Sequence, residues 1–445
     1  KEDGEGALFG TIGAEGVVSN LTSAGEISGG LGGPKGTTKL GHVGGFVGRL
    51  YGKLVNVTNT GKVKGIATYN AGVAGFVQQG AVLDGVKNYG EITSSAAYVA
   101  GVAAYVYEDA EFNKCVNYGN ISSSVAAGYA AGIAATALPS KFVECVNEGQ
   151  ISSGSSAGIV ANCSGKSGGL IYTFDRCQNN GEVTGNGILG GITAVQGATA
   201  GNNVCHYIQC VNNGDITATA TQAVSSSAMA GIAAFYSPGS VFEYCINTGF
   251  VTNTKSVYTA GIAANNKGSA TADYPVVFKG CVNTGNIASS AQQIAGIVAY
   301  ITNYTSVDSC LNYGTIEQGI WGAAGICYTM AGTTSSLTNC INYGDVSVTQ
   351  YNAGGIVGNC ASTTAVIENC VNVGNITSTT TAEKNNYGVG GIAGSSYATM
   401  KNCFNAGKVV GKLRVGGIVG SPSYNANGAR TQLVNCVNVG LITAD

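Results

Sequence analysis

One short phrase, Cys-x-Asn-x-Gly-x-Ile/Val, recurs along most of the sequence. Its first complete copy begins at Cys115 and its last at Cys436. Three earlier copies have an aliphatic residue in the Cys position: Leu21, Val57 and Val86. The glycine of the phrase runs from Gly25 to Gly440 in fourteen copies, which gives thirteen intervals of about 32 residues each over 415 residues. A period of this length is typical of stacked repeats, so the sequence predicts a solenoid.

Each repeat reads as a set of short strands separated by turns. Between Val143 and Ile151 alternate residues are apolar or small, which is the pattern of a strand with one buried face. A second phrase, Ala/Gly-Gly-Ile/Val-x-Ala/Gly, lies between copies of the first, for example at 131–135 and 416–420. No stretch shows a sustained helical period, and the five prolines lie outside both phrases. We therefore predict an all-β parallel β-helix (β-solenoid) of about fourteen coils of about 30 residues, with about three strands per coil and a right-handed coil expected a priori.

The composition supports one long stack and points to no particular activity. Hydrophobic residues make up 44% of the 445 residues, and a stack can grow beyond the size of an ordinary globular core. Residues 1–445 are interpreted as one continuous domain, either a segment of a longer chain or a unit of a stacking filament. Charged residues are only 10% and the net charge is -2, so we expect no nucleic-acid partner. No apolar run is long enough to span a membrane.

The Cys and Asn of the phrase are expected to form two columns. Free cysteine is among the most buried residue types, so the phrase cysteines are interpreted as buried, unbridged fillers. They are Cys115, Cys145, Cys177, Cys210, Cys245, Cys281, Cys310, Cys340, Cys370, Cys403 and Cys436. The Asn amide can bond to the backbone and to the same Asn of neighbouring coils, which predicts an asparagine ladder. Its members are Asn117, Asn147, Asn179, Asn212, Asn247, Asn283, Asn312, Asn342, Asn372, Asn405 and Asn438.

Two further expectations follow from the phrase. Its Gly either adopts a positive φ or permits a close approach that a Cβ would block. An asparagine outside the phrase, such as Asn253, should contribute far less to stability than a ladder asparagine.

Candidate catalytic and metal-binding residues are few. The only two histidines, His42 and His206, lie in unrelated coils. Acidic residues gather in two adjacent coils and are interpreted as a solvated loop face, with Lys114 and Lys141 isolated among them. These acidic residues are Glu108, Asp109, Glu111, Glu144 and Glu148. The cysteines show no Cys-x-x-Cys spacing, so we predict no metal site, no cofactor and no catalytic residues.

Aromatic residues recur just before the second phrase and are candidates for contact with glycans, because sugar rings stack on exposed aromatic faces. The alternative is that these rings pack on one another along an edge of the solenoid. The candidates are Tyr98, Tyr129, Tyr258, Trp321, Tyr351 and Tyr387. Six Asn-x-Ser/Thr sequons are candidate glycosylation sites, although the repeated phrase alone generates several of them. They begin at Asn20, Asn56, Asn120, Asn162, Asn303 and Asn375.

Several copies of the second phrase resemble the GLUG motif. The closest are at 45–48, 355–358, 391–394 and 417–420, each reading Gly-apolar-apolar-Gly, and the opening segment around Gly6 and Phe9 is similar. Proteins with such repeats are typically large bacterial surface or secreted proteins. The resemblance therefore implies an extracellular location at the cell surface and a role as a rod or adhesin stalk.

Two classes of function remain open from the sequence. The first is a non-enzymatic extracellular structural rod, such as an adhesin stalk or filament subunit, that makes multivalent contacts, including contacts with surface glycans. The alternative is a β-helix carbohydrate-active enzyme or a glycan-binding lectin. The chain begins within a coil at Gly6 and stops one strand after Gly440. We therefore expect self-association end to end, or pairing with flanking domains of the same chain, because uncovered strand edges associate.

Overall fold

The computed structural model describes residues 6–29, 41–65, 67–165, 171–196, 203–219, 227–253, 257–290, 292–318, 321–379, 387–422 and 431–444. Within these ranges every regular element is a β-strand, from β1 to β69, and none is a helix. The chain divides into two compact units, Lys1–Gly197 with Cys205–Ala220, and Ala198–Val204 with Thr221–Asp445. Each unit is described separately. Whether the two act as the one continuous domain predicted from the sequence stays a prediction.

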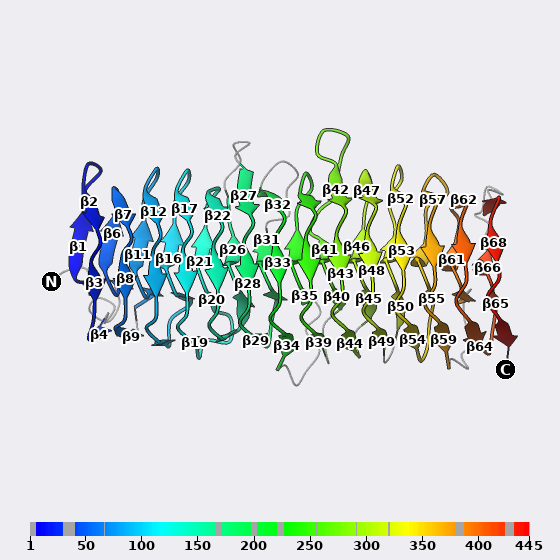
Figure 1. The fold of residues 1–445 in the computed structure, drawn as a ribbon, viewed down its shortest axis with the longest axis horizontal. Coiled ribbons are helices and arrows are strands. Elements are labelled where there is room, and N and C mark those ends of the chain that lie inside the picture. The colour runs from blue at the N-terminus through cyan, green and yellow to red at the C-terminus, as the bar shows by residue number, and fades with distance from the viewer. Residues whose placement is uncertain are drawn as a thin grey trace, which may run out of the picture. The chain divides into compact units, whose positions relative to one another are not determined.

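Both units are built from coils that visit five sheets, A to E, in the same order. Each strand pairs in parallel with its equivalent one coil away, as β16 does with β11 and β21. Figure 1 shows these equivalent strands side by side within each unit. The predicted all-β parallel solenoid is confirmed. Each coil has five short strands rather than about three, and there are slightly fewer complete coils than fourteen, because β1 to β4 lack a sheet A strand in the described residues.

The first unit contributes these strands. Sheet A contains β5 (His42–Gly44), β10 (Tyr69–Ala71), β15 (Tyr98–Ala100), β20 (Tyr129–Ala131), β25 (Ser155–Ala157) and β30 (Leu189–Gly190). Sheet B contains β1 (Phe9–Ile12), β6 (Val47–Leu50), β11 (Ala74–Val77), β16 (Ala103–Val106), β21 (Ala134–Ala137), β26 (Val160–Cys163) and β31 (Thr193–Gln196). Sheet C contains β2 (Val17–Ser19), β7 (Lys53–Val55), β12 (Val82–Asp84), β17 (Glu111–Asn113), β22 (Lys141–Val143), β27 (Ile171–Asp175) and β32 (Val204–Ile208). Sheet D contains β3 (Thr22–Ser23), β8 (Thr58–Asn59), β13 (Lys87–Asn88), β18 (Val116–Asn117), β23 (Val146–Asn147), β28 (Gln178–Asn179) and β33 (Val211–Asn212). Sheet E contains β4 (Glu26–Gly29), β9 (Lys62–Gly65), β14 (Ile92–Ser94), β19 (Ile121–Ser123), β24 (Ile151–Ser153), β29 (Val183–Gly185) and β34 (Ile216–Ala218).

The second unit repeats the arrangement. Sheet A contains β35 (Ala228–Ala230), β40 (Tyr258–Ala260), β45 (Gln293–Ala295), β50 (Gly322–Ala324), β55 (Ala353–Gly354), β60 (Val389–Gly390) and β65 (Val415–Gly416). Sheet B contains β36 (Ala233–Tyr236), β41 (Ala263–Asn266), β46 (Val298–Ile301), β51 (Cys327–Met330), β56 (Val357–Cys360), β61 (Ala393–Ser396) and β66 (Val419–Pro422). Sheet C contains β37 (Val241–Glu243), β42 (Val276–Lys279), β47 (Thr305–Asp308), β52 (Ser336–Thr338), β57 (Val366–Glu368), β62 (Thr399–Lys401) and β67 (Gln432–Val434). Sheet D contains β38 (Ile246–Asn247), β43 (Val282–Asn283), β48 (Leu311–Asn312), β53 (Ile341–Asn342), β58 (Val371–Asn372), β63 (Phe404–Asn405) and β68 (Val437–Asn438). Sheet E contains β39 (Val251–Asn253), β44 (Ile287–Ser289), β49 (Ile316–Gln318), β54 (Val346–Val348), β59 (Ile376–Ser378), β64 (Val409–Gly411) and β69 (Ile442–Ala444).

The core is filled by like residues that stack from coil to coil. Phe112, Phe142 and Phe174, one on each of three successive sheet C strands, are fully buried, and their ring centroids lie 4.9 and 5.3 Å apart. Offset stacking of aromatic rings stabilises a core beyond the area that it buries. Because parallel strands place equivalent residues about 4.8 Å apart, a repeat of sequence becomes a continuous column of contacts.

The glycine of the phrase is needed because a neighbouring backbone atom lies too close for a Cβ. Of the two reasons that the sequence left open, positive φ or close approach, the structure supports close approach. A Cβ on Gly119 would lie 2.0 Å from the carbonyl oxygen of Gly90, one coil earlier. Of the phrase glycines only Gly25 has a positive φ, of 104°. In most coils the left-handed residue is instead the one just before the Cys position, such as Lys114 with φ 51° or Glu144 with φ 52°. A left-handed turn thus precedes each sheet D strand without a consistent Gly signal.

Candidate functional site

A buried asparagine ladder runs through sheet D of each unit. In the first unit the Nδ2 of Asn117 donates to the Oδ1 of Asn147 at 2.8 Å and also to the carbonyl oxygen of Gly119 at 2.8 Å. The same pair of hydrogen bonds recurs in coil after coil. The first-unit ladder contains Asn59, Asn88, Asn117, Asn147, Asn179 and Asn212. The second-unit ladder contains Asn247, Asn283, Asn312, Asn342, Asn372, Asn405 and Asn438.

Sequence reasoning missed Asn59 and Asn88 as ladder members. Both lie in copies of the phrase that have Val in the Cys position, at Val57 and Val86. The unchanged Asn-x-Gly spacing in those copies was the signal that could have found them. In the first coil Ser23 pairs in register with Asn59, and its hydroxyl donates to the carbonyl oxygen of Gly45 at 3.1 Å.

The phrase cysteines line the interior beside the ladder. All fifteen cysteines of the chain are free, and all are buried except Cys436, which is partly exposed. The thiol of Cys177 donates to the carbonyl oxygen of Phe142 at 3.2 Å, one coil earlier, and Cys145 does the same to Phe112 at 3.4 Å. Two cysteines outside the phrase are buried as well, and burial raises the pKa of the Cys327 thiol and raises the pKa of Cys360 to about 11. These thiols are therefore packing groups and not exposed nucleophiles.

In the first unit, aromatic side chains gather where sheet A turns into sheet B. Tyr69 of β10 lies 4.8 Å from Tyr98 and 4.9 Å from Phe76 of β11, measured between ring centroids. Tyr98 stacks in turn on Tyr129 at 5.6 Å. Val99, next to Tyr98, is the residue of β15 that points into the core, so these tyrosines lie on the outer face. The outer faces of adjacent sheets can touch only where the coil bends inward. We name this bend, along which Tyr69, Phe76, Tyr98 and Tyr129 lie in the first unit, the A/B corner.

The second unit has aromatic residues in the same corner. The ring centroids of Tyr258 and Tyr300 are 5.7 Å apart, those of Trp321 and Tyr351 are 5.3 Å apart, and Tyr387 packs edge-on against Tyr351 at 4.3 Å. Trp321 remains 40% exposed. The six tyrosine and tryptophan positions singled out in the sequence thus lie along the A/B corners, each packed against another aromatic ring. Burial beside Tyr300 raises the pKa of Tyr258, which keeps this phenol protonated near neutral pH.

Uncharged polar side chains share the corner of the second unit, and sequence reasoning did not find them. Asn265 of β41, Tyr300 of β46, Thr329 of β51 and Asn359 of β56 are paired in register on sheet B. On sheet A, Gln293 of β45 is the register partner of Tyr258. No single residue type repeats along this line, so no sequence phrase marks it.

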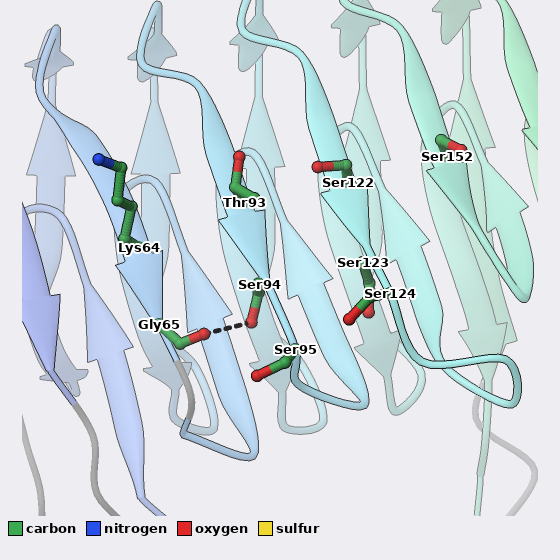
Figure 2. A pocket seen from close by; sticks show the side chains of 9 residues that line it. All are labelled: Lys64, Gly65, Thr93, Ser94, Ser95, Ser122, Ser123, Ser124 and Ser152. Atoms are coloured by element: carbon green, nitrogen blue, oxygen red, sulfur yellow. Dashed lines mark hydrogen bonds between the residues drawn. The ribbon is translucent and has the colours of Figure 1, made fainter.

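A shallow depression lies over sheet E of the first unit. Its volume is about 530 Å³. Figure 2 shows that its lining consists of hydroxyl side chains from successive coils with Lys64 at one end. Two of the hydroxyls serve the fold, because Ser94 donates to the carbonyl oxygen of Gly65 at 2.8 Å and Ser123 to that of Ala96 at 2.7 Å. Lys64 pairs with Glu26 at 3.3 Å. The depression contains no carboxylate or imidazole that could act as a base.

The acidic residues of the first unit do not form an isolated cluster. Lys141 lies 3.1 Å from Glu111, and Lys114 lies 3.9 Å from Glu144, so the expectation that these lysines are isolated was wrong. Asp109 and Glu111 border a hollow of about 140 Å³ together with Lys141. The ion pairs are exposed and contribute little to stability.

The two histidines lie in different coils. His42 is buried, packs on Phe76 with ring centroids 4.2 Å apart, and accepts a hydrogen bond from the guanidinium of Arg49 at 2.9 Å. That bond needs a neutral ring nitrogen. His206 is on β32, on sheet C. Over the described ranges no three His, Cys, Asp or Glu side chains come together as metal ligands, and no helix is long and apolar enough to cross a membrane.

The sequon asparagines all lie within the described residues. Asn20, Asn56, Asn120 and Asn375 are exposed, whereas Asn162 and Asn303 are partly buried. The Oδ1 of Asn120 accepts a hydrogen bond from the backbone N–H of Gln150 at 3.0 Å, so its amide already serves the turn between coils.

Comparison of the chain with protein-family models, with curated proteins and with solved structures finds no match. The fold and the residues of the chain therefore carry the functional argument by themselves.

Proposed function

We propose that this chain is a non-enzymatic structural solenoid that acts at the cell surface as an adhesin stalk or filament subunit. The observation that carries the proposal is the asparagine ladder, in which each buried amide bonds to the next coil through most of each unit. The ladder ties neighbouring coils together and leaves the interior without a cavity for substrate at these positions. A repeated interior of this kind provides length and stiffness, while the outer positions are free to vary.

The extracellular location rests on the resemblance of the Gly-apolar-apolar-Gly segments to the GLUG motif and on the exposed sequons. A surface protein with repeated outer faces can gain affinity from many weak, equivalent contacts. Glycosylation at Asn20, Asn56, Asn120 or Asn375 is compatible with their exposure.

The proposed partners are further coils, in the same chain or in another copy. Leu433 and Ile442, in the last described coil, are 50% and 43% exposed. Their equivalents Leu337 and Ile376, which have a neighbouring coil on both sides, are fully buried. A coil of the same register would cover these apolar side chains and the open strand edges beside them.

The alternative is a carbohydrate-active protein. The hollow beside Asp109 and Glu111 is the feature that favours an enzyme, although Lys141 pairs with Glu111 there. The aromatic A/B corners favour a lectin, because they combine ring edges and faces with uncharged polar groups.

Activity assays on the full chain separate the enzyme from the scaffold. The protein is incubated with pectins, glycosaminoglycans and wall glycans, with and without calcium, and new reducing ends or unsaturated products are measured. The scaffold proposal expects no turnover above a buffer control. Turnover that is lost in Asp109→Asn or Glu111→Gln, but kept in Glu148→Gln, would overturn it. Negative-stain micrographs of the same sample test the second part, since compact particles without any elongated form contradict a stalk or filament.

A further inference from the structure

The A/B corner of the second unit has the chemistry of a binding surface for an uncharged ligand. Strands β40, β41, β45, β46, β50, β51, β55 and β56 contain no Asp, Glu, Lys or Arg. One charged group lies beside this surface, because the ammonium of Lys267 is 3.8 Å above the ring of Phe235 on β36, and Phe235 is the register partner of Asn265. The strands themselves supply no cationic side chain that would attract an anionic ligand, whereas their aromatic rings and amides suit a ligand with apolar faces and hydroxyls.

Several polar groups of this corner have no partner among the residues that the structure describes. The Oε1 of Gln293 is buried and accepts no hydrogen bond from them. The side-chain amides of Asn265 and Asn359 make no hydrogen bond in the part of the chain that the structure describes. Thr329, between Tyr300 and Asn359 in the same register, is 8% exposed. A buried acceptor without a donor is costly, and because the Gln293 side chain as a whole is only partly buried, a turn of its amide would offer this acceptor to a donor from outside the chain.

The same combination occurs at the equivalent place in the first unit. Thr136 pairs in register with Tyr105 and with Asn162 on sheet B. It is 2% exposed, and its Oγ1 has no hydrogen-bond partner within the described ranges. Tyr105 is its register partner on the neighbouring sheet B strand, and Tyr129 lies on the sheet A strand of the same coil. Partnerless polar groups beside aromatic rings therefore recur in the A/B corner of both units.

The floor of the second-unit corner is closed by Tyr328. This residue packs on Ala295 and Ala324 and is 7% exposed. Most other coils have Ala or Gly at its position, and a Cβ on Gly358 in the next coil would lie 2.3 Å from the Tyr328 ring. The Tyr328 ring thus fills the space between Trp321 and Gln293. A ligand bound there would contact the surface of the corner and would not enter the core.

From these observations we propose that the second-unit A/B corner binds a neutral, unbranched polysaccharide of pyranose sugars. Each sugar has an apolar C–H face for the rings of Trp321, Tyr351 or Tyr258, and hydroxyls that can donate to the Oε1 of Gln293 and bond with the amide of Asn265. The polar positions repeat once per coil, about every 4.8 Å, along the direction in which an extended chain would lie. This inference rests on the proposed adhesive role and names its ligand class.

Binding is measured on the full chain by affinity electrophoresis and calorimetry. The neutral probes are a linear β-glucan, a mannan and a xylan without acidic branches. The charged probes are polygalacturonate and chondroitin sulfate, and a polyproline peptide tests the other ligand that docks on aromatic surfaces. At least one neutral probe should bind, and the charged probes and the peptide should not. Absence of binding to every neutral probe, or equal binding to charged probes or to the peptide, overturns the proposal.

Two variants locate the site. Trp321→Ala combined with Tyr351→Ala should weaken binding by about tenfold or more. The matched control is Tyr313→Ala with Tyr343→Ala, a stacked pair just after the sheet D strands β48 and β53 whose rings are 4.6 Å apart and whose side chains are 48% and 41% exposed. This control should keep the affinity within about twofold. Equal losses in both double variants would place the binding elsewhere and refute the assignment.

Gln293→Met separates a ligand contact from a structural role. The change removes an acceptor that has no hydrogen-bond partner in the described part of the chain, so the melting temperature should stay the same or rise. Affinity for the bound glycan should fall about fivefold or more, because a hydroxyl of the ligand loses its acceptor. A fall in melting temperature with unchanged affinity contradicts the proposal. Failure of all these binding tests leaves the scaffold proposal to be judged by turnover and micrographs, which do not involve this corner.

Discussion

Removal of one rung of the asparagine ladder should destabilise the protein by an amount that the structure allows us to work out. The Nδ2 of Asn283 donates to the Oδ1 of Asn312 at 2.8 Å and to the carbonyl oxygen of Gly285 at 2.9 Å, and its Oδ1 accepts from Asn247 at 2.8 Å. Asn283→Ala deletes three buried hydrogen bonds. At about 1 kcal/mol net for each bond, the free energy of unfolding should fall by about 3 kcal/mol.

The assay is equilibrium unfolding in urea followed by circular dichroism, with wild type and variant compared at the same protein concentration. The midpoint should move to lower urea while the slope stays constant. Asn286→Ala is the matched control, because Asn286 is exposed, lies three residues further along and accepts a single bond from the backbone of Thr315 at 2.9 Å. Its effect should stay within about 0.5 kcal/mol. Equal midpoints for the two variants would refute the ladder argument.

Asn253 does not serve as the weak comparison that the sequence suggested. It is 1% exposed, and its Nδ2 donates to the hydroxyl of Thr259 at 2.8 Å. Position outside the repeated phrase therefore does not mean exposure to solvent. Asn253→Ala removes a buried bond as well and should also be destabilising.

Two other predictions follow from the interior. Gly285→Ala should unfold at a markedly lower urea concentration than Gly13→Ala. A Cβ on Gly285 would lie 2.0 Å from the carbonyl oxygen of Gly249, whereas a Cβ on Gly13 would have nothing within 4 Å. Equal midpoints in the same urea assay would contradict this prediction. A thiol reagent at pH 8 should label native protein rapidly at no more than Cys436, while denatured, unreduced protein should show fifteen reactive thiols. Because the raised pKa of Cys360 is about 11, its native reactivity should not increase until the pH approaches that value, and rapid labelling at several sites at pH 8 would disprove the buried column.

The sequence by itself determined the class of fold and much of the interior. Identical spacing of Cys, Asn and Gly in each copy can be satisfied at once only if equivalent positions stack, as they do in a parallel solenoid. The phrase asparagines were therefore predictable as contacts between coils. The copies at Val57 and Val86 show that the Asn-x-Gly spacing is a better guide than the Cys.

The tertiary structure alone decided where each coil bends and what gathers at the bends. The left-handed residue is Asn in six copies of the phrase and Gly in two, but it is also Lys114 or Glu144 in others, so residue type alone does not mark the turn. The inward bend between sheets A and B places Gln293, Asn265 and Tyr300 in one corner. Each of these residues differs in type from its equivalent in the next coil. A search for repeats finds positions with the same residue type and does not find residues that are merely close in space. Residues in adjacent coils become neighbours through strand pairing about 4.8 Å apart, whatever their type, and only the folded chain shows which types meet.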